Sequence, residues 1–482
     1  MSSSAAPAVP DLDRLAIDTI RTLSMDAVEA AKSGHPGTPM ALAPVAYTIW
    51  KDFLRYDPLD PHWPNRDRFV LSCGHASMLL YSLIHLAGIR QAGPGRDGHD
   101  ELAVSLESIR QFRQLGSRCA GHPEHHLTIG VETTTGPLGQ GCGNSVGMAI
   151  ASRWLSGRFN QPDATLVDFD TYVLCSDGDL MEGVACEAAS LAGHLKLANL
   201  CWVYDDNAIT IEGETDLAFS EDVGRRFEGL GWRVERVADA NDTAAIGRAL
   251  SCFKDETERP TLIIVQSVIG YGAPTKAGSH ASHGAPLGPE EVSGAKESYG
   301  WPAGESFHVP AEVPEQFAAT LGQRGAAARA AWQTIHESAQ SSAPALTAEL
   351  DCLLAGDLPQ GWEDAIPSFP ADAKGLASRV SSGKVLQALS GCIPWFLGGS
   401  ADLAPSTMTL VPDAGDFSAE MPAGRNFHFG IREHAMAAAA NGMALSGLRP
   451  YTATFFVFFD YLKPALRLSA LGELGVLYVL TH

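Results

Sequence analysis

Two oxygen-bearing side chains stand at the ends of two apolar segments near the middle of the chain. Asp177 follows the segment 171–175, and Asn207 follows the segment 200–204. A helix is expected between them, from about residue 182 to residue 195, so the span fits one βαβ crossover. Parallel strands joined in this way end side by side, at the edge where open α/β sheets bind ligands. We therefore expect Asp177 and Asn207 to lie close together in a binding site.

The chemistry that these residues suit is the binding of a hard divalent cation. Asp177 offers a carboxylate, Asn207 an amide oxygen and Ile209 a backbone carbonyl, and oxygen ligands with few charges favour Mg²⁺ with positions left for phosphate. Gly178 lets the backbone approach a phosphate at the start of a helix. Asp-Gly and Asp-Asp-Asn are also common in ordinary turns, but their combination at this spacing favours a metal and phosphate site.

Three histidines lie in loops bounded by glycine or proline. His35 follows a helix expected over residues 11–32, His75 follows an apolar strand, and His122 lies in the sequence CAGHPE. A single loop histidine is more often solvent-facing than functional, whereas three in such loops indicate a site. The glycine-rich sequence GPLGQGCG at residues 136–143 precedes a further helix and suits a phosphate or a flat ring.

The second half of the chain again alternates strands and helices. A helix is expected near residues 325–338, and the sequence PWFLGG predicts a strand that leads to Asp402 and Ser406. Glu433 alone would be interpreted as an acid that complements the dipole of the helix it begins. That helix is so rich in alanine and glycine that it must pack closely against another element. The last segment, GVLYVLTH, predicts a buried strand whose carboxyl end points at the active site.

These motifs, taken together, resemble those of transketolases. The spacing of Asp177-Gly178 and Asp206-Asn207 resembles the thiamine diphosphate (ThDP) signature, and LMEG, SLAGHLKL and YDDN are similar to transketolase sequences. KSGHPG, GVETTTGPLGQG, KAGSH, GGSADLAPS and GIREHAM are further similarities, so the resemblance covers nearly the whole chain. Ser176 departs from the family pattern, which has glycine there, and we expect the turn to tolerate this serine.

The resemblance implies an α/β fold with two ThDP-binding-type domains, each built on a parallel sheet. It divides the chain into a disordered tail (1–10), a diphosphate- and Mg²⁺-binding domain (11–302), a connecting region (303–372) and a pyrimidine-binding domain (373–482). Enzymes of this kind are homodimers, in which the first domain of one subunit and the second domain of the other form each active site. The second domain is expected to be incomplete, because family members continue past the sequence TH at which this chain stops.

The resemblance also implies the roles of individual residues. The Mg²⁺ ligands would be Asp177, Asn207 and the Ile209 carbonyl, and Ca²⁺ or Mn²⁺ can substitute for Mg²⁺. The residues matching cofactor-contacting positions are His75, His122, Gly136, Pro137, Leu138, Gly178, Glu182, Asn207, His280, Asp402, Phe455, Phe458 and Tyr461. The residues matching substrate-contacting positions are His35, His280, Arg379, Ser406 and His482. The implied catalytic residues are Glu433, which activates the pyrimidine ring of the cofactor, and His35, His280 and His482.

The activity implied is transfer of a two-carbon ketol unit from a ketose phosphate, of the xylulose 5-phosphate type, to an aldose phosphate through a ThDP carbanion-enamine. Arg379 would bind the terminal phosphate, and the histidines would move protons and bind hydroxyls. The alternatives are a ketol transferase similar to dihydroxyacetone synthase and an inactive thiamine-binding remnant. The pentose phosphate pathway and the Calvin cycle both remain open. Because the second domain is expected to be incomplete, we expect this chain alone to have little activity.

The composition is typical of a globular cytoplasmic protein. The chain has 482 residues, too many for a single core, and a formal net charge of −22. That charge argues against nucleic acid or an anionic membrane as a partner. The nine cysteines show no metal-binding or paired spacing and indicate a reducing cytoplasm. No apolar run reaches the roughly 18 residues that span a membrane.

Overall fold

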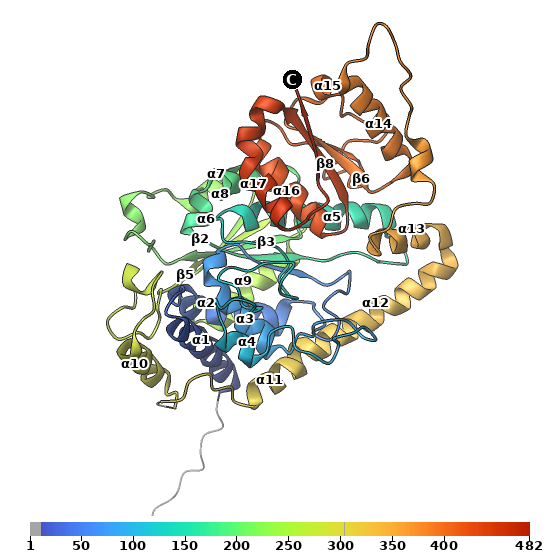
Figure 1. Cartoon of the computed structure of the whole chain (residues 1–482). Coiled ribbons are helices and arrows are strands. Elements are labelled where there is room, and N and C mark those ends of the chain that lie inside the picture. Colours follow the sequence, from blue (N-terminus) through green and yellow to red (C-terminus); the bar gives the residue numbers. More distant parts are fainter. Residues whose placement is uncertain (1–10, 303) are drawn as a thin grey trace, which may run out of the picture.

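Two separate parallel sheets organise the chain, which confirms the fold class expected from the sequence. In the computed structural model, which describes residues 11–302 and 304–482, the sheets belong to two α/β units stacked one above the other (Figure 1). The tail expected at residues 1–10 lies outside the described residues. Within the described residues, no helix combines the length and the apolar character needed to cross a membrane.

The first unit contains a five-stranded sheet with the order β1-β2-β3-β5-β4, in which every neighbouring pair is parallel. Val173 and Leu174 of β2 point into two different hydrophobic cores, one on each face of this sheet. Burial on both faces explains why β1, β2, β3 and β5 are largely apolar, whereas the edge strand β4 has the sequence RVERV and is partly exposed. The strands are β1 (Arg68–Leu71), β2 (Thr171–Ser176), β3 (Leu200–Asp206), β4 (Arg233–Val237) and β5 (Thr261–Gln266).

Helices cover both faces of this first sheet. The helix expected at residues 182–195 is confirmed as α7 (Gly183–His194), and a short helix, α6 (Asp177–Met181), precedes it with Glu182 between them in an extended conformation. The helices of the first unit are α1 (Leu12–Ala31), α2 (Gly37–Thr48), α3 (Ser77–Leu86), α4 (Leu106–Arg110), α5 (Gln140–Phe159), α6 (Asp177–Met181), α7 (Gly183–His194), α8 (Val223–Gly229), α9 (Thr243–Asp255) and α10 (Pro289–Tyr299).

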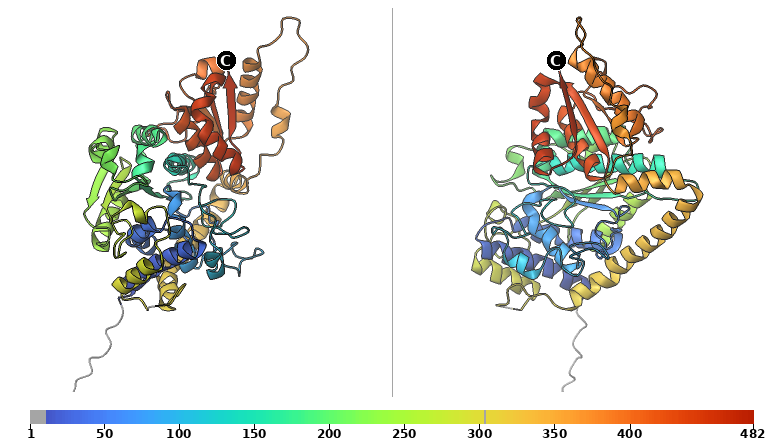
Figure 2. Two further views of the ribbon diagram at one scale, coloured as in Figure 1. Left: turned by 60° about the vertical axis from the view of Figure 1, so that its left-hand side comes forward. Right: turned by 45° about the vertical axis from the view of Figure 1, so that its right-hand side comes forward.

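The connecting region is more helical than the sequence indicated. The expected helix near residues 325–338 is confirmed as part of α12 (Gln323–Ser342), but α11 (Glu312–Phe317) and α13 (Pro344–Leu354) flank it. These helices run along one side of the molecule from the first unit to the second (Figure 2). An irregular segment then leads from α13 to the second unit and projects beyond it (Figure 2).

The second unit contains a four-stranded parallel sheet with the order β7-β6-β8-β9. The prediction that the last strand is buried was wrong: every residue of β9 is at least partly exposed, because β9 lies at the edge of the sheet with β8 as its only paired neighbour among the described residues. The elements are α14 (Ser378–Cys392), β6 (Phe396–Ser400), α15 (Ala404–Thr407), β7 (Asn426–His428), α16 (Glu433–Leu445), β8 (Arg449–Phe455), α17 (Phe459–Leu471) and β9 (Leu477–Thr481).

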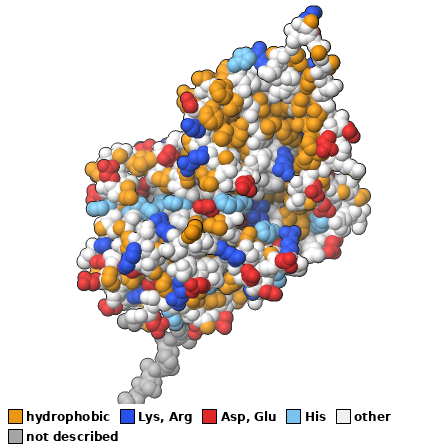
Figure 3. All heavy atoms as spheres, viewed as in Figure 1, with side chains coloured by type: hydrophobic (Ala, Val, Ile, Leu, Met, Phe, Trp, Pro, Cys, Tyr) orange, Lys and Arg blue, Asp and Glu red, His pale blue; other side chains and the backbone are white. Residues whose placement is uncertain are grey.

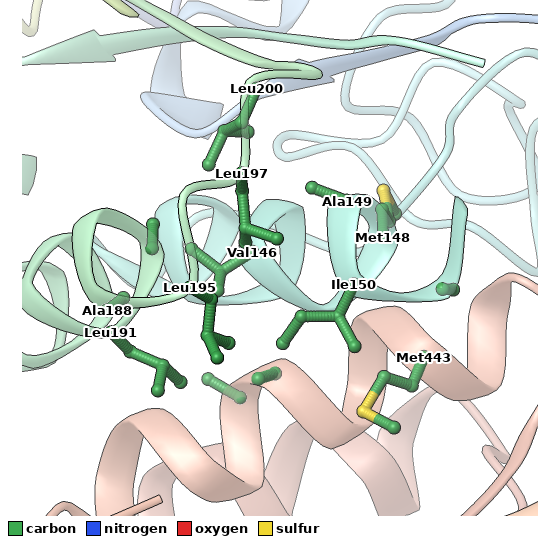
Figure 4. Packing of buried hydrophobic residues seen from close by; sticks show 14 of the residues in the cluster. Val146, Met148, Ala149, Ile150, Ala188, Leu191, Leu195, Leu197, Leu200 and Met443 are labelled. Atoms are coloured by element: carbon green, nitrogen blue, oxygen red, sulfur yellow. The ribbon is translucent and has the colours of Figure 1, made fainter. Parts of the chain in front are cut away.

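Helix α16 packs against α5, which confirms that its alanines and glycines serve a close contact (Figure 4). A Cβ atom added to Gly147 of α5 would lie 1.8 Å from the carbonyl oxygen of Ala439, and one added to Gly442 of α16 would lie 1.8 Å from that of Asn144. Only glycine allows two helix backbones to approach so closely. The two units therefore share one hydrophobic core, in which Val146 and Met443 take part (Figure 4).

Candidate active site

A cavity of about 310 Å³ opens where β2 and β3 end, at the edge of the first sheet. The register of β2 and β3 pairs Ser176 with Asp205, so the residues that follow the two strands emerge side by side. This confirms the expected proximity of Asp177 and Asn207. The lining residues are His35, Thr38, His75, His122, Gly136, Leu138, Ser176, Asp177, Gly178, Asn207, Ile209, Thr210, Ile211 and His283.

Asp177 carries a carboxylate oxygen that has no partner. Its Oδ1 accepts a hydrogen bond from the Tyr204 hydroxyl, while its Oδ2 is buried and unpartnered. Burial raises the pKa of Asp177 to about 7; the Tyr204 hydrogen bond opposes this rise, and the nearby Asp205 and Asp206 carboxylates add to it. A buried polar atom without a partner is unfavourable, and a bound cation would satisfy it.

Asn207 is held so that its amide oxygen has one lone pair free. Its Nδ2 donates to Asp205 Oδ2 at 2.7 Å, and the Ile209 backbone N–H donates to its Oδ1 at 2.9 Å. Burial raises the pKa of Asp205 to about 6, and hydrogen bonds from Ser267 and Asn207 oppose that rise. In residues 11–302 and 304–482, no group of three or more His, Cys, Asp or Glu side chains is placed to hold a metal. A cation here would therefore need amide and carbonyl oxygens besides Asp177.

Asp179 fixes the glycine-rich loop to the start of α6. Its Oδ1 accepts from the Gly139 backbone N–H and from the Ser72 hydroxyl, each at 2.7 Å, and its Oδ2 accepts from the Ser176 N–H at 2.9 Å. Ser176 itself is extended, with φ −125°, so the serine is tolerated as expected. A Cβ on Gly136 would lie 2.9 Å from the His122 ring, so the loop passes close to that histidine.

Histidines form one wall of the cavity. The His75 ring lies 5.1 Å from that of His35 and 5.2 Å from that of His283. Burial lowers the pKa of His35 to about 4, with His283, Arg113 and His122 adding to the effect, and burial also lowers the pKa of His75, His122 and His283. His35 Nδ1, His75 Nε2 and His283 Nδ1 are buried without a hydrogen-bond partner.

Several residues expected in the first half of the site lie outside this lining. His280 is exposed, whereas His283, three residues later, takes the place beside His75. Glu182 is exposed, and Pro137 is half-buried next to the lining residue Leu138. Sequence reasoning missed His283, Asp179 and Asp205. The repeated histidine in the sequence HASH and the second carboxylate of DGD were the available signals.

The residues expected from the second unit gather elsewhere, and none of them lines the 310 Å³ cavity. Glu433 is buried at the start of α16, where the Thr454 hydroxyl donates to it at 3.1 Å. The Phe458 ring stacks between Phe455 and Tyr461, with centroid distances of 6.0 and 5.9 Å. Tyr461 is 62% exposed, so this aromatic group lies at the surface rather than in the core.

Asp402 lines a separate cavity of about 610 Å³ between the two units, together with Ser190 and Arg432. Its backbone is left-handed, with φ 61°, which is a strained conformation for a residue other than glycine. Ser406 and Arg379 are half-buried, and His482 is exposed after β9. The candidate residues of the chain thus form two separate groups. One is a polar cavity with orphaned atoms, and the other is an acid with an exposed aromatic stack.

Comparison with known proteins identifies the family of the chain. The family model for the transketolase thiamine diphosphate binding domain matches residues 12–359, and the model for the transketolase pyrimidine binding domain matches residues 374–482. The chain belongs to the transketolase family. It is 51% identical to a transketolase of Geobacillus stearothermophilus over 472 residues, which is 98% of this chain and 69% of the relative. A transketolase of Bacillus subtilis is 48% identical over the same shares of both chains.

Solved structures of transketolases have the same fold. A Pichia stipitis transketolase in complex with sedoheptulose 7-phosphate is 42% identical and superimposes with a TM-score of 0.93, over 98% of this chain and 69% of that one. The transketolase of Campylobacter jejuni gives a TM-score of 0.87 over 98% of this chain and 70% of that one. The function of the chain is accordingly that of a transketolase, and ThDP is its cofactor.

Proposed function

We propose that this transketolase transfers a two-carbon ketol unit between sugar phosphates, with ThDP held by a divalent cation in the 310 Å³ cavity. The observation that carries the proposal is the set of buried polar atoms in that cavity that lack a partner: Asp177 Oδ2, His35 Nδ1, His75 Nε2 and His283 Nδ1. Buried polar atoms are otherwise paired in folded proteins. Their gathering in one cavity fits a polar, charged ligand.

Asp177, Asn207 and the Ile209 carbonyl would hold the cation, preferably Mg²⁺, with Ca²⁺ or Mn²⁺ as substitutes. Gly136, Leu138 and Gly178 would contact the diphosphate, whose charge the start of α6 favours. When bound, ThDP supplies a carbon nucleophile that protein side chains lack. His35 and His75, kept neutral by burial, would accept hydrogen bonds from substrate hydroxyls and move protons between them.

The second unit would complete the site of another copy of the chain. The stack of Phe455, Phe458 and Tyr461 suits the flat pyrimidine ring, and Glu433 would donate a hydrogen bond to a nitrogen of that ring. Asp402 would lie beside the same ring. Arg379 is only half-buried, and its guanidinium would bind a substrate phosphate. Ser406 and His482 would contact the sugar from the same side.

The apolar surface around the aromatic stack supports the proposal that a second copy of the chain binds there. Phe456 and Val457 are 68% and 67% exposed, next to the exposed Tyr461. Hydrophobic side chains also gather over the second unit in the space-filling view (Figure 3). Large exposed apolar patches mark interaction sites. We propose that a homodimer covers this patch and brings it against the cavity of the partner.

Three measurements test the proposed function. Calorimetry should detect ThDP binding that depends on Mg²⁺ or Ca²⁺. Sedimentation equilibrium should detect a dimer whose dissociation constant falls when ThDP and Mg²⁺ are added. With xylulose 5-phosphate as donor and ribose 5-phosphate as acceptor, formation of a seven-carbon ketose phosphate should require both ThDP and the cation. Binding of ThDP with equal affinity in the presence of a chelator would refute the metal assignment.

A further inference from the structure

The residues on either side of Glu433 are held by three side chains of the first unit. Arg432 lies before Glu433, and His434 and Ala435 follow it at the start of α16. Each is bonded to a different first-unit residue, so Glu433 is the centre of a three-point attachment. The contacts are Arg432 Nη2 to Ser190 Oγ (2.9 Å), Gln140 Nε2 to His434 Nε2 (2.7 Å), and the Ala435 backbone N–H to Glu187 Oε2 (3.0 Å).

Gln140 differs from the other two attachments in its place in the chain. It is the first residue of α5 and directly follows the loop 136–139, of which Gly136 and Leu138 line the cofactor cavity. The hydrogen bond from Gly139 to Asp179 pins the end of that loop one residue before Gln140. A ligand that moves or orders the loop must therefore act on the position of the Gln140 side chain.

The contact between Gln140 and His434 is partly buried. Gln140 is only 2% exposed, and its amide Nε2 lies 2.7 Å from Nε2 of His434, which accepts the hydrogen bond when the imidazole carries its proton on Nδ1. The other amide atom of Gln140, Oε1, is buried without a partner. Gln140 is thus held by His434 alone among the described side chains. This bond couples the Gln140 side chain directly to the first turn of α16.

We propose that Gln140 and His434 are positioning residues that transmit occupancy of the diphosphate cavity to Glu433. When the cavity is filled, the ordered loop would fix Gln140, and Gln140 would hold the first turn of α16 through His434. This inference rests on the proposed function. If Glu433 serves the cofactor of the partner subunit, the same bond links the cofactor loop of one active site to the acid of the other.

The test uses inorganic diphosphate with Mg²⁺, which fills the phosphate part of the cavity but has no pyrimidine ring to contact Glu433 directly. Amide hydrogen exchange is measured by mass spectrometry with and without this probe. In the wild-type protein, we expect exchange to slow in residues 207–210 and, by roughly tenfold, in residues 433–436. In Gln140→Ala, exchange should still slow in residues 207–210 but should no longer slow in residues 433–436.

Two further variants make the result specific. Gln140→Met keeps the length of the side chain but removes its hydrogen-bonding amide, and it should behave like Gln140→Ala. Glu349→Gln weakens the ion pair between Glu349 and Arg158, 2.8 Å long, at the other end of α5, and it should behave like the wild type. Thermal unfolding of each variant verifies that it is folded before exchange is measured.

Each outcome decides a separate question. If the probe slows exchange in residues 207–210 but not in residues 433–436 of the wild type, the coupling does not exist. If both Gln140 variants keep the slow exchange in residues 433–436, the coupling does not pass through Gln140. If the probe changes neither segment, the assignment of the cavity to diphosphate is wrong, and the inference fails with the proposed function.

Discussion

One added methyl group at the contact between α5 and α16 should weaken the attachment of the second unit. In Gly147→Ala, the new Cβ would lie 1.8 Å from the carbonyl oxygen of Ala439. Non-bonded heavy atoms need roughly 3.5 Å, so the two helices would have to separate by more than about 1.5 Å. The obstacle is a helix carbonyl, which cannot rotate out of the way without breaking its own hydrogen bond.

The expected loss of stability follows from the packing around this point. Overpacking a core costs about 1–3 kcal/mol, and a backbone obstacle places Gly147→Ala at the upper end. Separation would also loosen contacts along the shared core, of which Ala438 and Met443 are members. The gain from replacing a helical glycine by alanine, up to about 1 kcal/mol, is too small to compensate. We expect a net loss of about 2–3 kcal/mol in the free energy of unfolding.

The assay is urea unfolding followed by tryptophan fluorescence, since Trp154 in α5 and Trp395 in the second unit are both buried. With a slope of about 3 kcal/mol per M, the midpoint should fall by roughly 1 M. The matched control is Gly247→Ala in α9, because a Cβ there meets nothing within 4 Å, and its midpoint should stay the same or rise. A midpoint for Gly147→Ala equal to that of the wild type would refute the close contact of the two backbones.

The remaining predictions concern the site. Asp177→Ala should reduce the affinity for ThDP with Mg²⁺ by more than roughly 100-fold in calorimetry, whereas Asp206→Ala should reduce it far less; equal effects would contradict Asp177 as the metal ligand. Glu433→Gln should leave the melting temperature and ThDP binding unchanged but slow exchange of the thiazolium proton by at least about 100-fold; wild-type exchange would exclude the role. Burial lowers the pKa of His35 to about 4, below its ordinary value, so the folded protein favours the neutral imidazole. The contribution of His35 to the free energy of unfolding is therefore fully present above about pH 6.5 and is lost as the pH falls towards 4. Its imidazole NMR signals should not titrate between pH 8 and 5.5, and a midpoint near 6.5 would contradict its burial.

The parallel strands and the proximity of Asp177 and Asn207 could be predicted because local patterns determine them. Apolar runs ending at Asp177 and Asn207 indicate strands, and parallel connection brings their ends together whatever the rest of the chain does. The small residues of the helix that begins at Glu433 likewise indicated a close contact. They did not identify α5 as the partner, since the two helices begin some 290 residues apart in the sequence.

Other features could not be predicted because they depend on distant neighbours. Asp179 receives its hydrogen bond from Gly139, forty residues away, and nothing near Asp179 reveals that donor. Which of His280 and His283 lines the cavity depends on how one turn of the loop packs. The exposure of β9 depends on the order of strands in the sheet, which an apolar run does not specify.

The shared core between α5 and α16 should hold the two units together without a covalent link between them. Residues 368–377 are exposed and contain no helix or strand, and they project away from the contact in Figure 2. The entropic cost of closing a loop of this kind is modest and grows only slowly with its length. The core between the units, by contrast, is held by backbone-to-backbone packing. A cut in this segment should leave two fragments that remain associated. The same architecture could be assembled from one polypeptide or from two.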